Sequence, residues 1–139
     1  MVEYLLIFKT SFLASTILPL GSEPLFIYYL GKESLSKVIL LFSATIGNSL
    51  GSMTTFGVGW YLPLKTALNK LSIDESKYKR ISDYLSDRSF LFSFFCFLPV
   101  VGDVIAFYYG VNRLSPLRFC LYMTMGKFAR YSLLLAMFF

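Results

Sequence analysis

A helix breaker and a carboxylate interrupt an apolar run at Leu98-Pro99-Val100-Val101-Gly102-Asp103. Fourteen uncharged residues precede Asp103 and nine follow it. Because an α-helix needs about 20 apolar residues to cross a bilayer, neither piece spans the membrane alone. Backbone at membrane depth can leave the helix only where protein or a water-filled cavity covers it. The run therefore predicts a re-entrant hairpin that breaks at Pro99 and Gly102, with a site at its tip.

The same pattern occurs earlier, at Leu18-Pro19-Leu20-Gly21-Ser22-Glu23. Here Pro19 and Gly21 precede the acid Glu23, and the uncharged pieces on either side are again short. Each hairpin is followed by a polar link and a longer apolar segment. We infer two copies of a hairpin plus a spanning helix, and two unrelated kinked helices are the alternative. Paired, interrupted apolar segments in the two halves of a chain favour a transporter-type binding site.

The composition places this pattern in a membrane. Hydrophobic residues make up 56% of the 139 residues and charged residues only 15%, with a mean hydropathy of +0.64, which is too apolar for a soluble domain. The net charge of +5 favours contact with anionic lipid headgroups rather than nucleic acid. The chain has no histidine, and neither a nucleophile–base pair nor a set of metal ligands is visible. We therefore expect no enzyme, no cofactor and no metal.

The segment between Lys37 and Lys65 holds 27 uncharged residues and is the only uninterrupted run long enough to span a bilayer. Residues four apart share one face of a helix, so Gly47 and Gly51 predict close helix packing in lipid. This ridge would serve as a sliding or homodimer surface or, in the favoured interpretation, as static packing against the hairpins. Asn48 adjoins the ridge and can hydrogen-bond across it. The ridge consists of Ser43, Gly47, Gly51, Thr55 and Gly59.

Residues 63–88 form the main hydrophilic stretch and divide the chain into two repeats, 1–62 and 89–139. The residues from Ser72 to Glu75 fit a capping box, which predicts a helix over 73–87. That helix would lie at the membrane interface with an apolar face, or serve as a solvated connector. We expect a single all-α integral membrane domain over 1–139. It would be an inverted repeat of two re-entrant hairpins, each followed by a transmembrane helix, with this interfacial connector helix between them.

Lys127 and Arg130 lie in the last apolar segment, three residues apart and so on one helix face. Charges within a span are rare and usually face protein or water. An isolated charge at the bilayer centre costs at least roughly 3 kcal/mol, whereas two acids and two bases can cancel. We therefore expect Glu23 and Asp103 to meet these two bases near mid-membrane and to form a substrate- or proton-binding site with them.

Taken together, four motifs resemble the DedA family of bacterial membrane proteins, which is related to the SNARE-associated Golgi or VTT-domain proteins, and most closely its short YqaA-type branch. The likeness covers nearly the whole chain except 63–88. It implies two hairpins in an inverted repeat, a bacterial inner-membrane location, and roles in moving phospholipid or undecaprenyl phosphate and in proton-coupled transport for envelope homeostasis. Larger members have a Gly-Asp pair where this chain has Gly47-Asn48. The motifs lie at 18–23, 44–51, 98–103 and 126–131.

Three functions remain open from the sequence. In a lipid translocator, the half-helix starts at Ser22 and Asp103 would suit a phosphate headgroup, with Lys127 and Arg130 as countercharges. In a proton-coupled small-solute transporter, Glu23 or Asp103 would carry the proton. In a non-transporting scaffold, the charges would only lock the fold. The partners expected are membrane lipids, protons and a second copy of the chain. The connector and the link that contains Arg113 and Arg118 together hold eight Lys and Arg, whereas the 32–37 link holds two. This difference favours a cytoplasmic connector.

Overall fold

The computed structural model describes all residues except 17–21, 63–65, 67, 68, 70, 71, 73, 75, 78, 81, 82, 85–87, 96, 97, 99, 100 and 139, and the side chains of 89 and 90. Every regular element within the described residues is a helix. Among the helices whose backbone the structure describes in full, the order of two short helices followed by a long one occurs twice. The elements are α1 (Val2–Ala14), α2 (Glu23–Leu30), α3 (Lys37–Tyr61), α6 (Ser89–Phe94), α7 (Val101–Val111) and α8 (Pro116–Phe138).

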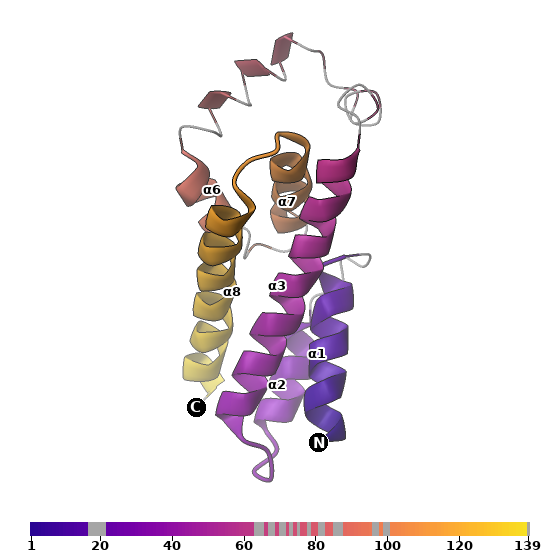
Figure 1. Cartoon of the computed structure of the whole chain (residues 1–139). Coiled ribbons are helices and arrows are strands. Elements are labelled where there is room, and N and C mark those ends of the chain that lie inside the picture. Colours follow the sequence, from indigo (N-terminus) through magenta and orange to yellow (C-terminus); the bar gives the residue numbers. More distant parts are fainter. Residues whose placement is uncertain are drawn as a thin grey trace.

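The long helix α3 extends along most of the bundle, and α8 runs in the opposite direction (Figure 1). The helices α1 and α2 accompany the half of α3 that lies near the two chain ends, whereas α7 packs on its other half. Both ends of the chain therefore lie at one end of the bundle. The described part of the connector between α3 and α6 lies at the opposite end (Figure 1).

The break in the first hairpin begins earlier than the proline predicts. The sequence favours a helix that continues to Leu18, but α1 ends at Ala14 and the chain turns at Ser15 and Thr16. The Thr16 hydroxyl donates to the carbonyl oxygens of Phe12 and Leu13, at 3.2 Å each. These side-chain bonds satisfy two of the last carbonyls of α1 at the point where the helix ends. The expected break residues Pro19 and Gly21 lie outside the described residues, as does Pro99.

Glycines permit the closest helix crossings, and they do so at equivalent places in the two halves. A methyl group on Gly47 of α3 would overlap the backbone carbonyl of Phe8 in α1. A methyl group on Gly126 of α8 would overlap the carbonyl of Phe94 in α6 in the same way. Each long helix thus packs tightly on the first short helix of its own half. The ridge glycines are covered within the chain, which supports static packing over a homodimer surface.

Among the described residues, α3 is the one helix long and apolar enough to cross a membrane, and α7 is a shorter apolar helix. The last segment forms a 23-residue helix as expected, but Arg118, Lys127 and Arg130 lower its apolar character. The predicted helix over 73–87 and its capping box fall mostly on positions outside the described residues. Ser22 is the N-cap residue of α2, but its hydroxyl makes no cap bond and contacts the Tyr131 hydroxyl instead.

A polar layer, formed by Lys127 and the residues hydrogen-bonded around it (Ser15, Asn48, Ser52 and Asp103), separates two apolar clusters. The cluster near the chain ends includes Ile7, Phe26, Leu40 and Tyr131. The cluster near the connector contains Phe56, Ala106, Tyr109, Phe119 and Met123. Along α8, the residues at every fourth position pass from the connector-side cluster, through Lys127, to the other cluster. Lys127 is the middle residue of α8, so the polar layer lies halfway along this helix.

Candidate functional site

Lys127 is the centre of the polar layer. Its residue is only 2% exposed, and the ammonium nitrogen Nζ donates to the backbone oxygen of Asn48 at 2.7 Å and to the Ser15 hydroxyl at 3.0 Å. It also donates to Oδ1 of Asn48 and to the hydroxyl of Ser52. A lysine ammonium has three donors and no acceptor, so this set of oxygens suits its charged form. The acceptors come from α3 and from the turn that follows α1.

Ser15 joins this lysine to the acid of the second hairpin. Its hydroxyl donates to Oδ1 of Asp103 at 3.2 Å and lies 2.6 Å from the hydroxyl of Ser52. Because a hydroxyl has one hydrogen, the bond to Asp103 leaves Ser15 to accept from Lys127 and from Ser52. The half-buried Asp103 lies in the first turn of α7, where the helix dipole favours an anion. Lys127 and Asp103 are thus linked through one serine.

Tyr131 extends the same network to the start of α2. Its hydroxyl lies 2.5 Å from the hydroxyl of Ser22 and accepts from Nδ2 of Asn48 at 3.1 Å. The Tyr131 ring packs edge-on against Phe26, with 5.0 Å between ring centroids. Because Asn48 also bonds Lys127, a chain of hydrogen bonds runs from the first hairpin through α3 and α8 to the second. The polar layer therefore ties both hairpins together.

Arg130 pairs with the acid of the first hairpin. Its Nη2 forms an ion pair with Oε1 of Glu23, which is the first residue of α2. The side chains of Arg130 and Glu23 are 17% and 35% exposed, so this pair lies nearer the surface than Lys127 does.

An apolar groove of about 220 Å³ lies beside this ion pair, between α6 and α8. Arg130 is the one charged residue among those described that line it. An apolar channel with a cation at its wall matches an amphiphile better than a small polar solute. The other lining residues are Phe94, Gly126, Ala129, Leu133 and Leu134.

The structure places the four predicted charged residues in two sets, Glu23 with Arg130 and Asp103 with Lys127. Gly102 is buried in the first turn of α7, and its N–H donates to the Leu98 oxygen at 2.9 Å. Asn48, predicted as a packing residue, is a direct ligand of Lys127. Within the described residues, no group of three His, Cys, Asp or Glu could hold a metal ion.

Sequence reasoning missed the hydroxyls that complete the network. Tyr131 follows Lys127 by four residues, and Ser52 follows Asn48 by four. This spacing puts each pair on one helix face, so it was a usable signal. Ser15 gave no signal, because its role depends on the early end of α1.

The all-helical fold, with one helix long and apolar enough to cross a membrane and a buried polar site, is consistent with a helical membrane protein. A Haemophilus influenzae protein of uncharacterized role is 32% identical over 137 residues, which cover 92% of this chain and 82% of that protein. The inner membrane protein YqaA of Escherichia coli is 30% identical over 125 residues, with 90% and 83% covered, and YqaA of Shigella flexneri gives the same values.

The chain therefore belongs to the YqaA family of inner membrane proteins. This relationship supports the DedA-type resemblance of the motifs and an inner-membrane location. No family model matches the chain, and no solved structure matches it.

Proposed function

We propose that this protein is a multi-pass transporter that moves lipids with anionic headgroups across the bacterial inner membrane. In this proposal α1–α2 and α6–α7 are re-entrant hairpins that enter from opposite faces, and α3 and α8 span the bilayer. The observation that carries the proposal is the apolar groove beside the Glu23–Arg130 pair. A lipid needs an apolar surface for its chain close to charged groups that can accompany its headgroup, and the groove provides such a surface beside an ion pair.

The charges of the polar layer fit transport better than a purely structural role. Each charged group held in a membrane is costly, and such groups commonly mark a substrate or ion path. Two of the four, Asp103 and Glu23, lie at the starts of half-helices. Half-helices that start near the midplane are a recurrent way to bind ions and headgroups in transporters.

A proton-coupled small-solute transporter is the second candidate, and the Ser15 bridge favours it. The hydroxyl of Ser15 contacts both Asp103 and Lys127, so it offers a route for a proton between a carboxylate and an amine. This route and lipid movement are compatible, since coupling to protons can drive either cargo.

The test is reconstitution into liposomes with fluorescent phospholipid, run with and without a pH gradient. We expect the parent to speed lipid movement between leaflets and the Asp103→Asn protein to lose that activity while remaining folded. Ser15→Ala should reduce the part of the lipid movement that depends on the pH gradient. Ser49→Ala is the matched control, because Ser49 is also a buried serine of this region but has no hydrogen-bond partner among the described residues.

A parent that moves neither lipid nor protons under these conditions would contradict transport and favour the scaffold. Gradient-driven proton uptake without lipid movement would select the small-solute transporter. If the Asp103→Asn protein moves lipid as fast as the parent, the charge of Asp103 in the polar layer is not needed for transport.

A further inference from the structure

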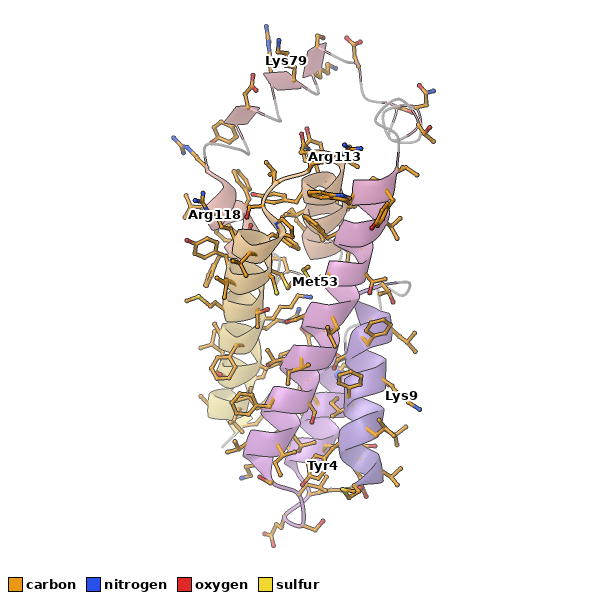
Figure 2. All side chains as sticks on the ribbon, in the orientation of Figure 1. Tyr4, Lys9, Met53, Lys79, Arg113 and Arg118 are labelled. Carbon is orange, nitrogen blue, oxygen red and sulfur yellow. The ribbon has the colours of Figure 1, made fainter. Side chains whose placement is uncertain are left out.

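A second, polar pocket of about 110 Å³ lies between α6, α7 and α8, apart from the Lys127 layer. Figure 2 places Arg118, which lines it, near the connector end of the bundle. Five of the residues that line it are polar, one of them an arginine, and none of the described lining residues is acidic. The polar lining residues are Ser93, Tyr109, Ser115, Arg118 and Tyr122.

The chemistry of this lining suits a phosphate group. Arginine presents a planar fork of donors that matches phosphate oxygens, often with two parallel bonds. The hydroxyl of Ser115, which lines the pocket together with Arg118, supplies a further donor for a phosphate oxygen. The cavity is well below the roughly 300 Å³ of a site for a drug-sized ligand, so it fits a headgroup and not an acyl chain. Ser93 and Tyr109 are both almost fully buried, which gives the pocket a fixed inner wall.

The polar pocket and the apolar groove lie next to each other along the same two helices. Ser93 lines the pocket, and the next residue of α6, Phe94, lines the groove. On α8 the pocket extends over Arg118 and Tyr122, and the groove continues from Gly126 to Leu134. Leu134 follows Arg118 by sixteen positions along α8, which corresponds to about 24 Å at 1.5 Å per residue. One face of the protein thus offers a headgroup pocket followed by a surface for a chain.

We propose that this face binds a lipid phosphate, with the phosphate in the Arg118 pocket and the acyl chain along the α6–α8 groove. The choice of a lipid rests on the proposed function, whereas the binding itself does not require translocation. The position agrees with this occupant, because Arg113 and Arg118 both lie near the connector end (Figure 2), where basic residues attract anionic headgroups.

Trp60 provides a natural reporter, because it is the only tryptophan of the chain. Its ring lies 5.7 Å from that of Phe56, which stacks at 5.0 Å on Phe119 in the pocket wall. We would titrate the detergent-purified protein with short-chain phosphatidic acid. The matched ligand is diacylglycerol of the same chain length, which lacks only the phosphate. A third titration uses inorganic phosphate.

We expect phosphatidic acid to change Trp60 fluorescence saturably and diacylglycerol to bind about tenfold more weakly or worse, since charge-assisted hydrogen bonds are lost. Arg118→Gln should weaken phosphatidic acid by a similar factor. Lys79→Gln is the control, because it removes one charge from an exposed connector residue near the same end and should leave affinity within about twofold. Ala129→Phe, which fills the groove, should weaken the lipid but not inorganic phosphate.

Equal affinity of Arg118→Gln and the parent would overturn the inference, as would an equal loss in Lys79→Gln, which would indicate general surface charge. Inorganic phosphate that binds as tightly as the lipid would contradict a lipid occupant. If Arg118→Gln does not fold, the exposed Ser115→Ala tests the same pocket. A protein that binds phosphatidic acid but moves no lipid would contradict only the proposed function. If the parent moves lipid but the Arg118→Gln protein binds phosphatidic acid as tightly as the parent, only this inference is contradicted.

Discussion

At the scale of single residues, the central finding is a lysine held in the interior by oxygens of its own chain. A buried charge without partners costs several kcal/mol, and a lysine so placed usually loses its proton or its position. Lys127 avoids this cost through Asn48, Ser15 and Ser52. Asp103 supplies the opposite charge one hydroxyl away. The network thus explains how α8 can carry a buried base at its middle.

Lys127→Met should be strongly destabilising, by about 3–5 kcal/mol, because it leaves Asp103 without its buried countercharge. Adding Asp103→Asn should recover part of the loss, because the unpaired charge disappears. Thermal unfolding in detergent measures both. The control is Lys9→Met, since Lys9 is exposed on α1 and points away from the bundle (Figure 2). A Lys127→Met protein as stable as the Lys9→Met protein would contradict the assigned role.

Tyr131→Phe isolates the hydroxyl that links Ser22 to Asn48. The ring keeps its packing on Phe26 while two hydrogen bonds disappear, so we expect a loss of about 1–3 kcal/mol. Tyr28→Phe should change stability little, because Tyr28 is exposed. Equal melting temperatures for the two variants would argue against a continuous network.

At the scale of elements, glycines decide where helices cross. Gly51 faces α1, and a methyl group there would lie 2.5 Å from the Phe12 oxygen and 2.8 Å from Cβ of Ser15. Gly59 of α3 and Gly110 of α7 form a second crossing. A methyl group added to either glycine would clash with the backbone of the other helix. Small residues permit such approaches in lipid, where packing drives association. The ridge therefore positions the short helices whose ends carry the site.

Gly51→Ala and Gly57→Ala form a matched pair within α3. Alanine stabilises a helix by up to about 1 kcal/mol relative to glycine. At Gly57 nothing lies within 4 Å of the new methyl group, so this variant should be as stable as the parent or more so. At Gly51 the backbone of α1 must move, and we expect a net loss of about 1–3 kcal/mol. Melting temperatures that rise equally in both would mean that α1 does not rest on Gly51.

At the scale of the whole molecule, the two ends of the bundle differ in charge. The chain ends and the α2–α3 turn lie together, with Lys32 and Lys37 in that turn region. The described part of the connector and the α7–α8 turn lie at the other end. Residues 63–88, together with Arg113 and Arg118, hold eight Lys and Arg. The more basic end is expected to face the cytoplasm.

Cysteine labelling tests this arrangement. In a protein whose Cys96 and Cys120 are replaced by serine, a cysteine at the exposed Glu33 should react from the periplasmic side. A cysteine at the exposed Lys79 should react only after the membrane is permeabilised. A cysteine at Met1 should react from the same side as the one at Glu33. Labels at Met1 and Glu33 that report opposite sides would exclude the re-entrant first hairpin. A uniform reversal of all three would preserve the fold and correct only its orientation.

The sequence by itself determined the helical class, the order of short and long segments, the close packing at Gly47 and Gly51, and the four charged residues that the structure arranges in two sets. These follow from local properties: apolar length, breaks at proline and glycine, and side-chain spacing along a helix. Only the tertiary structure decided which acid meets which base, and that Ser15 stands between Asp103 and Lys127. Those contacts join residues up to 112 positions apart. They depend on the angle at which helices cross and on where α1 ends, and no local pattern encodes either.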